Sequence, residues 1–268
     1  MNSAPANLQD IPGTGDRPSL SAIVITKNEE AVIGRCLDSV QWADEIIVVD
    51  SGSTDRTMEI AQQLHARIVV TPDWPGPGPQ RNRAIAHATK DWILALDADE
   101  WVSPELRDEI LAVLPAPGPH VGYRLPRLSS YCGRRMRHGG WWPDYVSRLF
   151  KRGSARFGGG IVHDHLLPDG PLGKLRNPLL HEAITDLDDM LLKLNSYSSW
   201  GAQSLYENGR RAGLATALGH GAWTFLRTYL LRAGFLDGRE GFMLAVSNAE
   251  GAYYKYLKLM LMGRHKSP

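Results

Sequence analysis

The sequence predicts an α/β fold with a mostly parallel central sheet, followed by a helical C-terminal region. Short apolar segments rich in β-branched residues alternate with segments of helical spacing over residues 20–115. This alternation is typical of parallel strands whose connecting helices cover both faces of the sheet. The 268 residues are 43% hydrophobic, which is enough for a sizeable core in one large domain or two modest ones.

Local patterns predict the individual elements. Four segments have the length and composition of buried strands: residues 20–26 (LSAIVIT), 45–49 (EIIVV), 66–70 (ARIVV) and 92–96 (WILAL). Asn28 is expected to cap the first helix, and Ser103 followed by Pro104 begins the helix after the fourth strand. A second helix follows the second strand, and residues 80–89 form the third. The proline-rich residues 71–79 are expected to be irregular.

Polar clusters follow three of these strands. They are TKNE at residues 26–29, DSGS at residues 50–53 and DADE at residues 97–100. In open parallel sheets, ligands bind outside the carboxyl ends of the strands. Because all three clusters should lie on that edge, the sequence predicts a binding site there.

Two Asp-x-Asp sequences occur in the chain, and their contexts differ. Asp97 and Asp99 follow a buried strand at the predicted ligand edge, where carboxylate oxygens suit Mg²⁺ or Mn²⁺ held together with substrate phosphates. Asp186 and Asp188 open a segment of helical spacing, so they are expected at a helix N-terminus. The first pair therefore predicts a metal–phosphate site.

Several function classes lack their sequence signals. No Gly-x-Gly-x-x-Gly follows the first strand and no Gly-Lys-Ser/Thr is present, which argues against dinucleotide oxidoreductases and P-loop enzymes. Lys and Arg (30) nearly balance Asp and Glu (29), so no nucleic-acid partner is expected. Two cysteines without zinc spacing fit a reducing compartment. Residues 1–19 lack the apolar segment of a signal peptide, so a cytoplasmic protein with a flexible tail is expected.

The segments AIVITKNEE, ADEIIVVDSGSTDRT, PQRNRAI and DWILALDADEWV resemble family 2 glycosyltransferases and occur in that family's order. With SRLF, IVHD, LLHEAI and FLRTYLLRAGFLDGREGF, the resemblance covers most of the chain outside the tail. It is strongest to the bacterial lipopolysaccharide-core β-1,4-glucosyltransferase-like branch. The resemblance implies a GT-A fold, which is a Rossmann-like sandwich. It also implies a nucleotide-sugar donor, a divalent cation and inversion at the anomeric carbon.

Residue roles carried over by motif are also what the resemblance implies. Thr26, Glu29 and Asp50 would hold the nucleoside, Asp97 would approach the ribose and the metal, and Asp99 would ligate Mg²⁺ or Mn²⁺ at the diphosphate. Arg81 is placed to approach the pyrophosphate, and an exposed helix arginine is an equally good interpretation.

An inverting glycosyl transfer needs one base to deprotonate the acceptor hydroxyl. Asp164 in IVHD stands where relatives usually carry Glu, and its shorter side chain shortens its reach. Asp144 in WWPD is the alternative. His163 or His181 is expected to complete the metal shell, because neutral imidazole is a competent ligand.

The expected division of the chain has three parts. They are a flexible tail (residues 1–19), a GT-A catalytic domain (20–185, with a nucleotide-sugar half 20–115 and an acceptor half 116–185), and a helical region (186–268). From residue 201 onward there are nine Lys/Arg against four Asp/Glu, and aromatic residues are interleaved with them. Apolar helix faces bordered by aromatic and basic residues suit helices that lie in a membrane interface. Helices that pack in an ordinary protein core are the alternative.

The function expected from these features is transfer of a hexose, glucose from UDP-glucose first, to a lipopolysaccharide core or other lipid-linked glycan. The reaction is expected at the inner face of the cytoplasmic membrane. Two alternatives belong to other classes: a sugar-phosphate nucleotidyltransferase and a non-catalytic sugar-nucleotide or lipid-binding module. The first would carry a Gly-rich basic loop after the first strand, and residues 26–29 do not form one.

Overall fold

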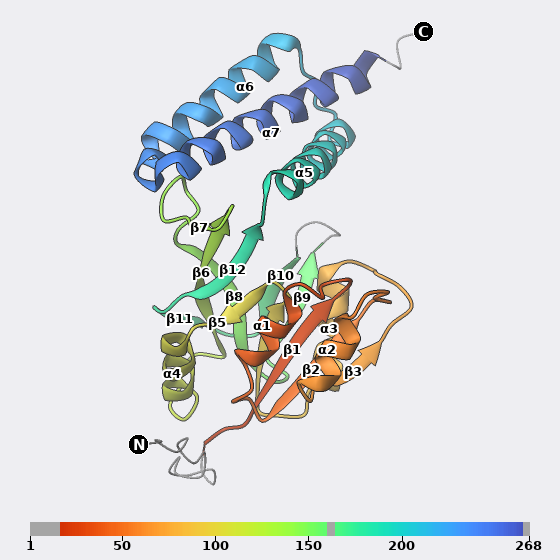
Figure 1. Ribbon diagram of the computed structural model, residues 1–268, viewed down its shortest axis with the longest axis vertical. Helices are drawn as coiled ribbons and strands as arrows, with labels where there is room; N and C mark the ends of the chain where they lie inside the picture. The colour runs from red at the N-terminus through yellow and green to blue at the C-terminus, as the bar shows by residue number, and fades with distance from the viewer. Residues whose placement is uncertain (1–16, 160–163, 265–268) are drawn as a thin grey trace, which may run out of the picture. The chain divides into compact units, whose positions relative to one another are not determined.

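A computed structural model describes residues 17–159 and 164–264 of the chain (Figure 1). The described residues form two compact units. The first contains the chain up to Leu125 together with Val146–Pro178, and the second contains Pro126–Tyr145 and the chain from Leu179 onward. The division expected at residues 185 and 186 stays a prediction.

The first unit is built on a mostly parallel sheet. Its strands are β1 (Leu20–Thr26), β2 (Glu45–Asp50), β3 (Arg67–Val70), β4 (Trp92–Asp97) and β11 (Leu172–Lys174), with the first residues of β6 (Gly122–Tyr131) and most of β8 (Asp144–Lys151). The spatial order is β3-β2-β1-β4-β8-β6, with β1 to β4 parallel and β8 antiparallel to β4. A separate two-stranded sheet pairs β9 (Ala155–Gly159) with β10 (Asp164–Pro168). The α/β fold with a mostly parallel sheet is therefore confirmed.

Short helices connect the strands of this unit. They are α1 (Ile33–Asp38), α2 (Thr57–Gln63), α3 (Pro77–His87) and α4 (Pro104–Val113), and a short strand β5 (Glu100–Val102) follows β4. Helix α3 packs on β1 and β2. The core beneath it contains the fully buried side chains of Ile23, Ile47, Val49, Ile93 and Phe150. Such burial of apolar side chains from several strands is the main stabilising contribution to the unit.

Two local expectations were wrong and one was right. Asn28 does not cap α1, because it has a positive φ of 56° and its side chain accepts the N–H of Thr54 instead. Helix α3 begins at Pro77, inside the segment expected to be irregular, because proline is tolerated in the first helical turn. Ser103 caps α4 as expected, and its hydroxyl accepts the N–H of Leu106 at 3.2 Å.

The second unit is mainly helical. It contains α5 (Leu187–Glu207), α6 (Leu214–Leu226), a π-helical turn η1 (Arg227–Leu231), a 3₁₀ turn η2 (Gly234–Asp237) and α7 (Gly238–Arg264). The strands β7 (Arg134–Arg135) and β12 (Leu179–Ile184) pair with the end of β6. Asp186 caps α5 by accepting the N–H of Asp189, which confirms the helix N-terminus expected there. Within residues 17–159 and 164–264, no helix is long and apolar enough to cross a membrane.

Candidate active site

The strand register of the first unit brings the three polar clusters to one edge of the sheet. Thr26 lies opposite Asp50, and Ile25 lies opposite Asp97, in parallel pairs whose carboxyl ends point the same way. The edge predicted to bind the ligand is thus assembled from β1, β2 and β4. Each of these strands is apolar along most of its length and ends in a polar residue, so the side chains of Thr26, Asp50 and Asp97 gather at this edge.

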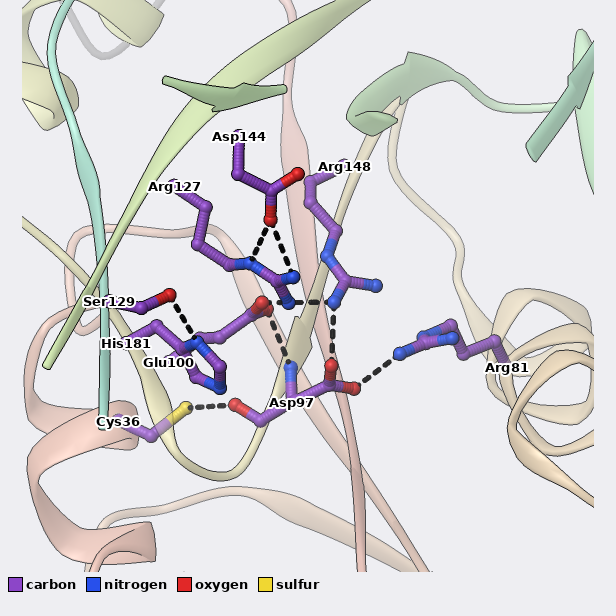
Figure 2. Close-up of polar contacts among 9 residues, drawn as sticks. All are labelled: Cys36, Arg81, Asp97, Glu100, Arg127, Ser129, Asp144, Arg148 and His181. Carbon is purple, nitrogen blue, oxygen red and sulfur yellow. Dashed lines mark hydrogen bonds and ion pairs between the residues drawn. The ribbon is translucent and has the colours of Figure 1, made fainter. Parts of the chain in front are cut away.

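Asp97, at the end of β4, is held between two arginines (Figure 2). Its Oδ1 accepts a hydrogen bond from Arg81 at 2.5 Å, and its Oδ2 accepts one from Arg148 at 2.6 Å. The Asp97 side chain is 27% exposed, whereas both arginine side chains are buried. Both carboxylate oxygens of Asp97 are therefore engaged by guanidinium groups of the protein itself.

Glu100 is the fourth member of this cluster. Its side chain is fully buried; one carboxylate oxygen accepts the backbone N–H of Asp97 at 3.1 Å and the other accepts Arg148 at 2.9 Å. The first bond closes the turn from β4 to β5, and the second links that turn to β8. A buried carboxylate requires such partners, since an unpaired buried charge is strongly destabilising.

The charges in this cluster shift the pKa values of its members. Burial and the positive charge of Arg148 lower the pKa of Arg81, although Asp97 and Glu100 oppose that shift. Burial by itself would lower the pKa of Arg148. The negative charges of Asp97 and Glu100 have the larger effect, so the pKa of Arg148 is raised. The pKa of the Cys36 thiol is raised by burial and by Glu100, Asp99 and Asp97. The cluster is thus a charge-compensated set of two carboxylates and two guanidinium groups.

The two residues that flank Arg81 in the sequence, Gln80 and Asn82, fix the orientation of helix α3. Asn82 exchanges two hydrogen bonds of 2.8 Å with the backbone of Phe157, one through its amide nitrogen and one through its oxygen. Gln80 is fully buried and donates to the hydroxyls of Ser51 and Thr71. These contacts orient the first turns of α3, so that Arg81 faces Asp97. The exposed position considered for Arg81 is therefore wrong.

Asp50 organises the turn after β2. Its Oδ2 accepts the N–H groups of Gly52 and Ser53 at 2.9 and 2.8 Å, and its Oδ1 accepts the Ser53 hydroxyl. The Ser53 hydroxyl in turn accepts the N–H of Asn28, in the loop after β1. Glu29, in that loop, donates its N–H to the hydroxyl of Thr57 at 2.8 Å. The loops after β1 and β2 are thus joined by side-chain to backbone bonds.

Thr26 and Asp99 are two further polar residues at this edge. Thr26 is buried, and its hydroxyl has no hydrogen-bond partner within the part of the chain that the structure describes. Asp99 is half-buried in the loop between β4 and β5. A hydroxyl and a carboxylate in these positions are suited to a polar ligand at the sheet edge.

A divalent cation at this edge of the sheet would need oxygen ligands. Among the described residues, no three His, Cys, Asp or Glu side chains are grouped as a metal site. Mg²⁺ bound with nucleotides needs only one or two carboxylates, because phosphates and water supply its other ligands. Asp99 fits such a cation, whereas both oxygens of Asp97 already accept from arginines. The donor set therefore fits a cation held jointly with a diphosphate.

The remaining candidate residues belong to β8, β12 and the segment that leads into β10. Asp144, the first residue of β8, accepts two hydrogen bonds from Arg127 at 3.0 and 2.7 Å and remains 44% exposed. Nδ1 of His181, in β12, lies 2.8 Å from the hydroxyl of Ser129. Asp164 begins β10, but its side chain lies outside what the structure describes, as does His163.

Comparisons with known proteins agree with this architecture. The profile of glycosyl transferase family 2 matches residues 21–165, which is more than half of the chain. The lipopolysaccharide core biosynthesis glycosyltransferase LpsC of Rhizobium meliloti is 32% identical over 250 residues, covering 89% of each chain. The chain belongs to glycosyl transferase family 2.

Two further similar proteins are a second glycosyltransferase and a sugar-transferring enzyme of solved structure. The uncharacterized glycosyltransferase RT0209 of Rickettsia typhi is 32% identical over 255 residues, which cover 90% of this chain and 86% of that one. Among solved structures, glucosyl-3-phosphoglycerate synthase from Mycobacterium tuberculosis, in complex with Mn²⁺, UDP and glucosyl-3-phosphoglycerate, is 30% identical with a TM-score of 0.34. That match covers 43% of this chain and 45% of the synthase. The chain described here is a glycosyltransferase, as its motifs predicted.

Two residues of this glycosyltransferase escaped the sequence-based assignment. No role was predicted for Arg148 from the sequence, although Arg148 lies in the SRLF segment that resembles the family, and Glu100 was expected only as part of the DADE cluster. The buried contacts between them show that both support Asp97. A signal was present: an arginine within the apolar strand β8 needs a buried acid, and Glu100 is a third acid beside a strand end.

Proposed function

We propose that this glycosyltransferase moves a hexose from a nucleotide-diphosphate sugar to a lipopolysaccharide core or similar lipid-linked glycan. UDP-glucose is the donor we place first. The observation that carries the proposal is the buried Asp97–Arg148–Glu100 cluster at the end of β4, which holds the loop bearing the half-buried Asp99. The name of LpsC, which aligns over 89% of both chains, supports the acceptor class.

Asp99 would hold Mg²⁺ or Mn²⁺ together with the donor diphosphate. Such a cation stabilises the negative charge that develops on the leaving diphosphate. Asp97 keeps the loop in place through its two arginines and forms the nucleotide-side wall of the site. Thr26, Glu29 and Asp50 would hold the nucleoside at the ends of β1 and β2, with Asp50 acting largely through the turn that it organises.

The base for an inverting transfer is Asp164 in this proposal, with Asp144 as the alternative. Asp144 already accepts two hydrogen bonds from Arg127 and so has a partner within the protein, which is why Asp164 is placed first. His181 is a further candidate metal ligand. An Asp164→Ala variant that retains donor binding but loses turnover would support this assignment, whereas full turnover would transfer the role to Asp144.

Donor binding is tested most directly by thermal unfolding with nucleotide sugars. At a concentration 100 times its Kd, a ligand stabilises the folded protein by about 2.7 kcal/mol, so the melting temperature should rise by roughly 5–11 °C. We expect this shift with UDP-glucose and Mn²⁺ or Mg²⁺, and a much smaller one without the cation. If neither metal with any nucleotide sugar shifts the transition, the proposed donor site is wrong.

A pair of matched substitutions assigns the metal role. Asp99→Ala should abolish cation-dependent turnover and the cation-dependent part of the thermal shift, while the melting temperature without ligand stays close to wild type. Asp188→Ala is the control, because Asp188 belongs to the other Asp-x-Asp sequence and lies exposed in the first turn of α5. A sugar-phosphate nucleotidyltransferase would release diphosphate rather than a nucleoside diphosphate, and a binding module would show no turnover.

We also propose that the helical unit binds the inner face of the cytoplasmic membrane. Residues 223–236 carry six large apolar side chains that are 44–68% exposed: Trp223, Leu226, Leu230, Leu231, Phe235 and Leu236. Exposed Arg227 and Arg232 lie among them. Exposed apolar side chains with arginines between them suit an anionic lipid surface.

Sedimentation with vesicles tests membrane binding. The protein should sediment with phosphatidylglycerol vesicles at low salt and not with phosphatidylcholine vesicles. Leu231→Glu should reduce this binding, whereas Leu192→Glu, at a similarly exposed position on α5, should not. Equal loss in both variants, or no sedimentation of the wild type, contradicts a surface at residues 223–236.

A further inference from the structure

The helical unit contains a cavity that the donor site does not explain. Its volume is ≈ 450 Å³, and it lies among α5, α7 and β12. This size is within the range of about 300–1,000 Å³ typical of small-molecule pockets. Its walls are largely apolar and include Trp141, Ile184, Met190, Leu194 and Leu244.

The cavity exists beside α7 because one face of that helix carries small residues. Ser247, Asn248, Gly251 and Ala252 all line the cavity, and their spacing of one, three and one residues places them on the same side of the helix. A Cβ atom added to Gly251 would meet only Cγ of Leu194, at 3.9 Å, which is ordinary van der Waals contact. Packing within the protein therefore does not require glycine there, although glycine within a helix is less stable than alanine. Gly251 keeps open a space that the protein itself does not fill.

A positive charge borders the cavity. Lys255 follows Gly251 by one helical turn and lines the same space. Within the described residues its ammonium group makes no hydrogen bond or ion pair, and its recorded contact is with the ring of Tyr256 at 5.1 Å. Lys193, which also lines the cavity, is already bound to Asp189 at 2.9 Å and to the carbonyl of Ala183 at 2.7 Å.

We propose that this cavity binds an acyl chain that carries an anionic head group, with the head group at Lys255. The apolar walls suit a hydrocarbon chain, and a sugar or nucleotide would need more polar partners than they offer. The amide of Asn248 lies two helical turns from Lys255 on the same face of α7 and is in position to bind the head group. This site lies wholly within the second unit and is independent of the proposed donor site.

Calorimetric titration of the full-length protein with short alkyl phosphates, below their micelle concentrations, tests the site. Decyl phosphate should bind with a saturable 1:1 isotherm, and octyl phosphate should bind about fifteenfold more weakly, because each buried methylene changes affinity about fourfold. Decyl maltoside and inorganic phosphate should each bind much more weakly than decyl phosphate. Decanoate titrated alongside decyl phosphate shows which head group binds more tightly, and so distinguishes a fatty-acid carboxylate from a lipid phosphate.

Two substitutions locate the bound chain. Gly251→Leu should abolish decyl phosphate binding without lowering the thermal midpoint, since leucine fills the space and favours the helix. Gly219→Leu is the matched control on α6, where an added Cβ meets nothing within 4 Å, and it should bind like the wild type. Lys255→Met should weaken binding about fivefold, while Arg210→Met, an exposed position outside the cavity, should have no effect.

Three results would overturn the proposal. They are the absence of saturable decyl phosphate binding to the wild type, equal affinities for the octyl and decyl chains, and wild-type affinity in folded Gly251→Leu. The first two need no variant, so they test the site even if a substitution prevents folding. Loss of UDP-glucose binding elsewhere in the protein would leave each of these results unchanged.

Discussion

Replacing Arg148 by methionine tests the account of the cluster at the end of β4. The substitution keeps an unbranched side chain of similar length but removes the guanidinium that contacts both Asp97 and Glu100. Glu100 would then be a fully buried carboxylate without its charge-assisted hydrogen bond from Arg148. Removing one partner of a buried ion pair typically costs about 3–5 kcal/mol, and we expect a loss in this range for Arg148→Met.

The companion change Glu100→Gln separates charge from shape. Glutamine can still accept the Asp97 N–H, and the charge-assisted bond to Arg148 becomes a neutral one, so a loss of about 1–1.5 kcal/mol is expected. In the double variant, the side chain at position 100 is neutral, so no buried negative charge loses its arginine. Its loss should therefore be smaller than the sum of the single losses by about 1–3 kcal/mol.

Urea unfolding followed by tryptophan fluorescence, together with thermal melts, measures these differences. A loss of 3–5 kcal/mol corresponds to a melting temperature lower by roughly 6–20 °C. Arg107→Met is the control, because Arg107 makes a surface pair with Asp108 and should contribute less than about 1 kcal/mol. An Arg148→Met loss below about 1 kcal/mol, or strictly additive losses in the double variant, would refute the role given to this pair.

Three further results are expected. Cys36 is buried and its pKa is raised by burial and by Glu100, so a thiol reagent at pH 8 should modify it only on unfolding; rapid modification of native protein would contradict this. Hydrogen bonds from Ser19 lower the pKa of Asp91, so its contribution to stability is present above about pH 4 and is lost at lower pH. In Asp91→Asn the free energy of unfolding should therefore fall less steeply with decreasing pH below about pH 4. An unchanged pH dependence would contradict the contribution assigned to Asp91. Ser103→Ala removes the α4 cap and should cost about 1 kcal/mol in urea unfolding, with a loss near zero as the contrary result.

The cluster explains why a buried strand ends in three acids. Asp97 and Glu100 are compensated by Arg81 and Arg148, so the negative charge that β4 carries to the sheet edge is largely neutralised within the protein. The arrangement is that of a loop supported by buried ion pairs, which is the form a precise site requires.

Local sequence was sufficient for the elements of the first unit and for the edge where the site lies. A run of β-branched residues has few stable alternatives to a buried strand, and parallel strands bring their carboxyl ends together whatever the connecting loops contain. Thr26, Asp50 and Asp97 were found at that edge for this reason. The capping of α4 by Ser103 was equally local, because its hydroxyl accepts the N–H of Leu106 in the first turn of the same helix; the donation of that hydroxyl to the carbonyl of Pro178 was not.

The partners of those residues depended on tertiary structure. Arg148 is 51 positions from Asp97 in the sequence, and only the pairing of β8 with β4 brings them together. The side chain of Asn28 caps the turn after β2 and not its own helix, because the neighbouring loop offered an N–H at the right place. The cavity at Gly251 exists because α5 and α7 pack with small residues between them. Sequence periodicity determines which face of an element is buried, whereas the packing of distant segments decides which charged groups meet and where space remains.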